Sequence, residues 1–202
     1  MARDSSATKA RLLDAAFSEF AAYGIAGARV DRIAEAAQAN KRLIYVYYGN
    51  KEQLFDAVLQ RALETGAESV PFDADDLPGY AGAVFDHLVA RPALMRLVLW
   101  KQLERPGAGE AESASVEEKL AAVRRAQDAG LVDPGPSAAD LLTLVMGLAQ
   151  AWFGAVGGPA ADRDDAGRVV GQLAGHRAAV VEAVRRLVAP PSSGPGPDGP
   201  GA

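Results

Sequence analysis

Side chains that can bind nucleic acid are concentrated between residues 40 and 51 of the 202-residue chain. Arginine and asparagine can form paired hydrogen bonds with guanine and adenine in the major groove, whereas lysine, tyrosine hydroxyls and helix N-termini suit phosphates. The surrounding segment, Val30–Leu54, reads VDRIAEAAQANKRLIYVYYGNKEQL. It predicts two short helices joined by a turn of about three or four residues, the arrangement that enters the major groove. The candidates at the start of the second helix, along its outer side or just beyond it are Asn40, Lys41, Arg42, Tyr45, Tyr47 and Lys51.

The elements that must position these side chains are predicted to be helices, because apolar residues recur at spacings of three and four and no run alternates like a strand. A first helix is expected over Thr8–Ala22, with Gly24 as its stop signal. The two motif helices are expected over Val30–Ala37 and Lys41–Tyr47. Asn50–Gln53 reads as a capping box that opens a long helix.

Helices are expected in the rest of the chain as well, which makes the predicted fold all-α with about nine helices in total. Their expected ranges are Pro78–Ala90, Pro92–Glu104, Ser115–Ala129, Ser137–Val156 and Asp162 to the residues before Pro190. Residues 105–113 are expected to form a flexible loop. The tail 190–202, PPSSGPGPDGPGA, lacks apolar residues to bury and is expected to be disordered.

The charge of the chain is distributed unevenly. The formal net charge is −5, but residues 1–52 hold eight Lys or Arg and six Asp or Glu, a net of +2. The remainder holds 13 basic and 20 acidic residues, a net of −7. Attraction to phosphates falls off within about 8 Å in physiological salt, so the local balance permits DNA binding although the total is acidic.

The composition also restricts the setting. There is no cysteine, which excludes disulfides and thiolate chemistry and makes a reducing cytoplasm the expected location. The first residues, MARDSSATKAR, lack the apolar stretch of a signal peptide. The uncharged run Leu141–Ala161 breaks at Gly157-Gly158-Pro159, which leaves about sixteen helical residues where a membrane span needs about twenty. A buried helix and no contact with a membrane are therefore expected.

The stretch Thr8–Phe55 resembles the TetR family of repressors. The first helix ends in F-A-A-Y-G, then R-I-A-E-A-A follows, and N-K-R-L-I-Y-V-Y-Y-G-N-K-E-Q-L-F is close to the family's usual K-x-x-[IL]-Y-x-[HY]-F-x-x-K-x-x-L ending. Beyond residue 60 only the general layout of helices is similar. Carried over by position, the resemblance implies a DNA-contacting set of Arg29, Asn40, Lys41, Arg42, Tyr45, Tyr47 and Lys51.

Three residues depart from the family pattern. Gln38 stands where glycine is common in the turn, so a non-glycine residue is expected in a left-handed conformation at a cost of about 1 kcal/mol. Arg29 replaces the usual Ser or Thr at the start of the first motif helix, and so offers no side-chain cap. Tyr48 replaces the usual Phe, and its hydroxyl is expected to need a partner.

The resemblance further implies a DNA-binding helix-turn-helix domain over residues 1–52 and a helical effector-binding and dimerisation domain over residues 53–189. The expected effector is a small apolar molecule of unknown identity. The protein is expected to hold no cofactor and no metal. An apolar wall with a few polar points suits such a ligand. The residues assigned to it are Phe85, Met95, Leu99, Trp100, Gln102, Met146, Gln150 and Trp152.

The last two long helices are expected to form a homodimer. Small residues fall at every fourth position in the final helix, which lets a neighbouring helix approach closely. These residues are Gly167, Gly171, Gly175, Ala179 and Ala183. Packing within one chain is an equal alternative for this stripe alone, but two half-sites on a palindromic operator independently require two copies. The effector would then release the operator by shifting the population of conformations.

Two other functions compete with a ligand-controlled repressor. An enzyme is disfavoured, because adjacent helical residues such as Asp86 and His87 do not face each other and His176 is isolated. A DNA-binding protein that senses no ligand is the second alternative. A cavity of several hundred Å³ would favour the sensor, and a filled core would favour the second alternative.

Overall fold

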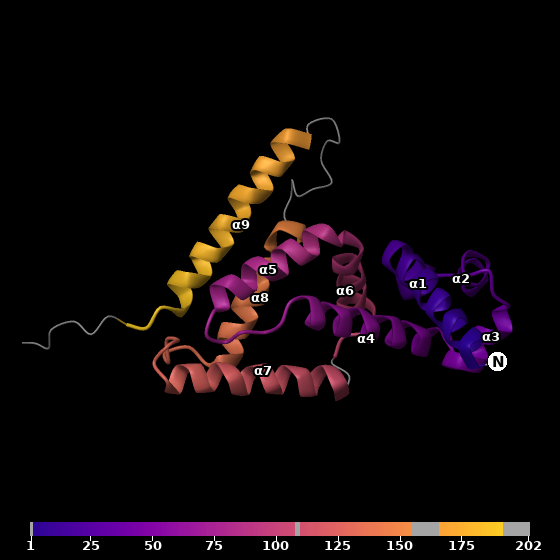
Figure 1. Cartoon of the computed structure of the whole chain (residues 1–202), viewed down its shortest axis with the longest axis horizontal. Coiled ribbons are helices and arrows are strands. Elements are labelled where there is room, and N and C mark those ends of the chain that lie inside the picture. The colour runs from indigo at the N-terminus through magenta and orange to yellow at the C-terminus, as the bar shows by residue number, and fades with distance from the viewer. Residues whose placement is uncertain (1, 108–109, 155–165, 192–202) are drawn as a thin grey trace, which may run out of the picture. The chain divides into compact units, whose positions relative to one another are not determined.

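The computed structural model describes residues 2–107, 110–154 and 166–191 (Figure 1). Within these ranges the chain forms nine helices and no strand, which confirms the predicted all-α fold. Contacts divide it into two compact units, one of Met1–Pro71 with Val84–Ala114 and one of Phe72–Ala83 with Ser115–Ala202. The predicted domain limits at residues 52 and 189 remain predictions, because compactness alone does not separate DNA binding from ligand binding.

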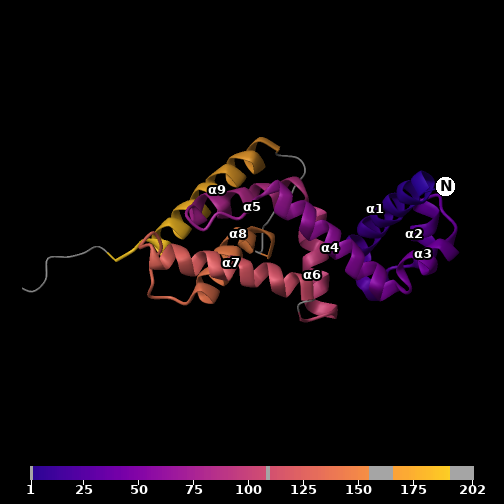
Figure 2. The same ribbon diagram turned by 60° about the horizontal axis from the view of Figure 1, so that its bottom comes forward.

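Four helices and a shared apolar core form the N-terminal part of the first unit. They are α1 (Ala2–Gly27), α2 (Val30–Ala36), α3 (Lys41–Tyr48) and α4 (Lys51–Ser69), and both views show α2 and α3 beside α1 (Figures 1 and 2). The apolar positions of their 3.6-residue periodicity converge on Phe20 and Phe55, whose rings meet edge to face at 5.2 Å. Ile33 and Ile44 are completely buried in the same core.

Helix α1 extends beyond the expected Thr8–Ala22 at both ends. It begins at Ala2, and Gly24 interrupts it with φ 68° and ψ −174° before a further turn up to Gly27. Only glycine adopts this backbone region readily, so the predicted stop at Gly24 is a break within a longer element. Helix α2 ends one residue earlier than expected and α3 one residue later.

The following helices include one correction. Helix α5 is Leu77–Ala90, and α6 is Pro92–Glu104 with its proline in the first turn, as expected. Helix α7 is Glu110–Asp128, so the predicted helix start at Ser115 was wrong, and so was the part of the predicted loop from residue 110 to 113; residues 105–107 are non-helical as expected. Glu112 accounts for part of the earlier start, because it lies 2.9 Å from Lys101 of α6 and its charge suits a helix N-terminus.

Helices α8 (Ala138–Gly154) and α9 (Ala166–Val188) pack against each other in the second unit. Ser137 caps α8 as expected, because its hydroxyl accepts a hydrogen bond from the Asp140 amide at 3.1 Å. The core of this unit includes Val123 of α7, Leu141 of α8 and Val184 of α9, each with no exposed surface. The expected helix start at Asp162, the end at Val156 and the tail from residue 192 lie outside the described residues.

Candidate nucleic-acid interface

The outer face of α3 presents two large side chains to solvent. Tyr45 is 47% exposed and Val46 is 63% exposed, whereas Ile44 is completely buried and fixes the rotation of the helix. Arg42 is exposed as well. Sequence reasoning selected polar residues and therefore missed Val46, although its place between the selected tyrosines on a short helix could have indicated it. A valine here can contact the methyl group of thymine, an apolar feature of the major groove.

Asn40 contributes to the interface by starting α3. Its extended backbone precedes the helix, and its side-chain oxygen accepts a hydrogen bond from the Arg42 amide at 2.8 Å. This N-cap satisfies one of the amides left unpaired at the helix start. The cap uses the side-chain oxygen Oδ1 of Asn40 and leaves the side-chain nitrogen Nδ2 free to donate to DNA.

Lys41 forms an ion pair across the motif with Asp31 of α2, at 2.7 Å. The hydrogen bond from Lys41 lowers the pKa of Asp31, and the same bond raises the pKa of Lys41. Both side chains are largely exposed, so the pair contributes little to stability. Lys41 can therefore exchange this carboxylate for a DNA phosphate at small cost.

Two tyrosines attach α3 to α1. The Tyr48 hydroxyl, expected to need a partner, donates to the Lys9 carbonyl oxygen at 3.2 Å. The Tyr47 hydroxyl accepts a hydrogen bond from Ser5 at 3.4 Å, and the Lys9 ammonium lies 5.0 Å from the centre of the Tyr47 ring. Tyr47 is thus half-buried and engaged with α1, while Tyr45 is the more accessible of the predicted tyrosines.

The start of α2 is stabilised by a residue from α1. Arg29 makes no side-chain cap, as expected, but its backbone amide donates to the Glu19 carboxylate at 2.8 Å. Arg32 Nε donates to the same oxygen at 2.8 Å. Burial raises the pKa of Glu19, but the hydrogen bonds from Arg32 and Arg29 outweigh it and hold that pKa below its ordinary value. The Arg29 side chain is left exposed at the edge of the motif.

The turn and the start of α4 follow the sequence expectation. Gln38 has φ 49°, the left-handed conformation predicted for a residue in a glycine position. Asn50 caps α4 by accepting from the Gln53 amide at 2.7 Å. Lys51, in the first turn of α4, is half-buried and reaches the Ala28 carbonyl oxygen at 3.4 Å. Lys51 thus lies close to the start of α2.

Helix α6 holds the break in α1 from both sides. Arg96 donates to the carbonyl oxygens of Ala21 and Ala22, at 2.9 and 3.1 Å, where the first segment of α1 ends. Glu104 accepts from the amides of Ile25 and Ala26, at 2.6 and 3.2 Å, where the helix resumes. The cation thus meets the negative end of one segment and the carboxylate meets the positive end of the next.

Trp100 lies between these two residues on α6 and packs on the break itself. A Cβ atom at Gly24 would lie 2.8 Å from both the Trp100 ring and the Glu104 carboxylate, so this approach requires glycine. Arg96, Trp100 and Glu104 recur at every fourth position and share one face of α6. We call these three residues the α6 clasp. Trp100 was predicted from the sequence to line an effector pocket, and no role was predicted for Arg96 or Glu104.

The predicted effector residues have different surroundings. In the first unit Phe85 and Met95 are buried, Trp100 packs on Gly24, and Leu99 and Gln102 are exposed. In the second unit Met146, Gln150 and Trp152 are half-buried. None of the eight lines either of the pockets described in the first unit. This set therefore stays a prediction.

Among the described residues, no group of three His, Asp or Glu side chains is placed to hold a metal ion. No helix in the described ranges is both long enough and apolar enough to cross a membrane.

Two family models match the chain. The model described as "Bacterial regulatory proteins, tetR family" covers residues 12–58, and the model described as "Tetracyclin repressor-like, C-terminal domain" covers residues 76–186. The curated protein "HTH-type transcriptional repressor SCO4008" of Streptomyces coelicolor is 44% identical over 191 residues, which cover 93% of this chain and 98% of that protein.

Solved structures agree with the family models. The crystal structure of the Streptomyces coelicolor transcriptional regulator SCO4942 is 40% identical with a TM-score of 0.78, over 90% of this chain and 98% of that one. Salmonella enterica GusR, at 17% identity and a TM-score of 0.64 over 90% of this chain and 95% of that one, supports the fold alone.

Proposed function

The chain belongs to the TetR family of bacterial regulatory proteins, and we propose that it is a repressor that binds a palindromic operator as a homodimer and releases it when a small effector binds. The family confirms the predicted resemblance and the predicted class, a DNA-binding transcriptional regulator rather than an enzyme. The observation that carries the proposal is the outward face of α3, where exposed Arg42, Tyr45 and Val46 follow a capped helix start.

On the operator, α3 would enter the major groove with its N-terminal end towards the bases. Arg42 would donate to guanine, and Val46 would contact a thymine methyl group. Tyr45, Lys41 and Lys51 would bind phosphates on either side of the groove, and Arg29 would reach the backbone from the start of α2. Tyr47 would act mainly by holding α3 on α1, because its hydroxyl already has a partner.

The experiment that tests this interface is a mobility-shift titration of Tyr45→Ala with Lys51→Ala on an operator selected from random DNA. Loss of the Lys51 contact should weaken binding and lower the salt slope by about 1, whereas loss of the Tyr45 contact should weaken binding without changing the slope, because tyrosine carries no charge. Arg124→Ala is the control, because it removes an exposed positive charge from α7, outside the proposed surface. Unchanged operator affinity in the double variant at a defined salt concentration would contradict the proposed DNA-binding interface.

The dimer would form through α8 and α9. An added Cβ atom would meet nothing within 4 Å at Gly147 of α8 or at Gly171 and Gly175 of α9, and Leu144 is 48% exposed. This exposure favours the dimer over packing of the small-residue stripe within one chain. The stripe continues through exposed Ala179 and half-buried Ala183, while the side-chain position of Gly167 lies outside the described residues.

The opposite side of α9 supports the same assignment. Val180, Val184 and Val188 recur at every fourth position and are buried within their own chain. The helix thus has one apolar face already covered and a second face of small residues that is open. A strictly monomeric mass at micromolar concentration, measured by light scattering, would contradict the dimer.

Control by an effector would act through the helices that contact the DNA-binding part, and α6 with its clasp is one of them. An effector can release the operator only if it binds better to a conformation in which the two α3 helices no longer match adjacent grooves. Helix α4 is one connection to the motif, because it follows α3 directly and packs on α1. The α6 clasp is a second connection, because it ties α6 directly to the helix that carries the DNA-binding core.

A further inference from the structure

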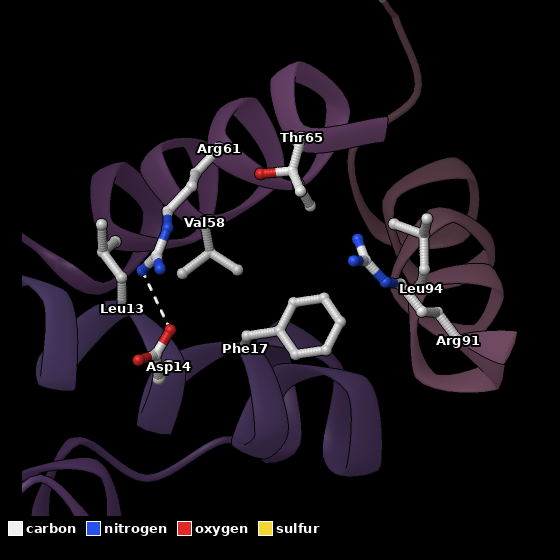
Figure 3. Close-up of a pocket in the computed structure, with 9 residues that line it drawn as sticks. Leu13, Asp14, Phe17, Val58, Arg61, Thr65, Arg91 and Leu94 are labelled. Atoms are coloured by element: carbon white, nitrogen blue, oxygen red, sulfur yellow. Dashed lines mark ion pairs between the residues drawn. The ribbon is translucent and has the colours of Figure 1, made fainter. Parts of the chain in front are cut away.

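A cavity of about 250 Å³, partly open to solvent, lies within the first unit, where α1, α4 and α6 meet (Figure 3). Its apolar lining includes Leu13 and Phe17 of α1, Val58 of α4 and Leu94 of α6. Engineered apolar cavities of about 150 Å³ bind benzene, so this space is large enough for a ring with a short substituent. None of the predicted effector residues contributes to it.

The cavity carries one uncompensated positive charge. Arg61 of α4 lies 3.0 Å from Asp14 of α1, so the charges of this pair cancel (Figure 3). Arg91, just before α6, also lines the cavity; it is exposed, and it forms no ion pair among the described residues. In the close-up its guanidinium points towards the Phe17 ring and Thr65 (Figure 3).

Among the described residues, the cavity lining holds no charged side chain besides Asp14, Arg61 and Arg91. His87 lies one turn before Arg91, and its Nε2 atom is buried without a hydrogen-bond partner. Burial lowers the pKa of His87, and the charge of Arg91 lowers it further. His87 is therefore neutral near pH 7, and the net charge of Asp14, Arg61 and Arg91 is +1.

We propose that this cavity binds a small amphipathic monoanion, whose apolar body lies on Phe17 and Leu94 and whose carboxylate accepts hydrogen bonds from Arg91. A single carboxylate neutralises the single excess charge, and the planar guanidinium can bind it through two parallel hydrogen bonds. Thr65, on the same face of α4 as Arg61, also lines the cavity. This site is additional to the predicted effector residues, and ligand binding there does not depend on operator recognition.

A bound ligand would contact three helices at once. Helix α1 carries the core of the DNA-binding part, and α6 carries the clasp on the break in α1. The ligand would fill the space between them and so stabilise their present arrangement. This places the site where a small molecule can influence the motif without touching DNA.

Isothermal titration calorimetry of the full chain, without DNA, tests the proposal with hydrocinnamate, a phenyl ring joined to a carboxylate by a short linker. Saturable binding of one hydrocinnamate per chain is expected, and hydrocinnamyl alcohol should bind at least tenfold more weakly because it lacks the charge. Arg91→Gln should weaken hydrocinnamate binding at least tenfold. Arg124→Gln, which alters an exposed arginine on α7, should leave it unchanged.

A second variant tests the cavity rather than the charge. Ala62→Phe places a ring in the cavity wall and keeps both arginines, so it should abolish binding. Thermal melts establish that each variant is folded, and if Ala62→Phe is not, Arg91→Gln and the alcohol still decide. No binding to the wild-type chain, or equal affinity in Arg91→Gln, would overturn the proposal. Because no operator is present, such a failure leaves the proposed repressor function untouched.

Discussion

Helices α3 and α6 both attach to α1, but they do so through different kinds of contact. Helix α3 depends on a local turn, the Asn40 cap and two neighbouring tyrosines, all within one continuous motif. Helix α6 depends on Arg96 and Glu104, whose partners on α1 lie 75 and 79 residues earlier in the chain. The role of α3 is therefore visible in the sequence, whereas the role of the α6 clasp appears only when the chain is folded.

The largest effect should come from Trp100 in the clasp. Trp100→Ala removes a half-buried ring from the break in α1 and should lower the free energy of unfolding by about 2–3 kcal/mol, below the cost for a fully buried tryptophan. Urea unfolding followed by circular dichroism, at one protein concentration, measures it. Leu103→Ala is the control, because Leu103 is 75% exposed on the same helix and should change stability by less than about 0.5 kcal/mol. Equal effects of the two substitutions would show that Trp100 does not stabilise the break in α1, and the predicted role in an effector pocket would then be the better explanation.

A smaller effect is expected at Glu19, where α1 supports the motif. Glu19→Gln should cost about 1–2 kcal/mol near pH 7, because it removes a charged acceptor for Arg29 and Arg32. The pKa of Glu19 is lowered in the folded chain, so this stabilisation is present above the unfolded-state pKa of about 4.3 and is lost as pH falls through the lower folded value.

Urea unfolding of the wild type and of Glu19→Gln at several pH values measures this difference. The stability difference between the two should shrink as the pH falls below about 4.3. Glu35→Gln is the control, because Glu35 is exposed on α2. A difference that stays constant with pH would show that the Glu19 charge does not stabilise the start of α2.

The smallest effect concerns the turn before α3. Gln38→Gly should raise the free energy of unfolding by about 0.5–1 kcal/mol, because glycine relieves the left-handed strain of the folded turn. The greater freedom of glycine in the unfolded chain offsets part of this gain. The same replacement at Gln60, exposed within α4, should lower stability by about 1 kcal/mol. Thermal unfolding of both variants compares the two signs. If both substitutions destabilise, the turn at Gln38 is not strained.

Most of the candidate DNA interface could be predicted from sequence. The residues of α3, the left-handed Gln38, the missing cap at Arg29 and the need of Tyr48 for a partner all follow from short-range patterns. Val46 was missed because its contribution depends on exposure and not on charge. The start of α7 was placed too late, since Glu112 pairs with Lys101 of the preceding helix.

The sequence by itself determined the helical fold, the helix-turn-helix motif and the family, because periodicity, caps and turn residues act between close neighbours in the chain. The tertiary structure alone decided that Glu19 supports the start of α2, that Trp100 packs on Gly24, and that Arg91 faces a cavity. These features arise where residues far apart in sequence meet. Local periodicity shows which face of a helix is apolar, but not which helix that face will contact.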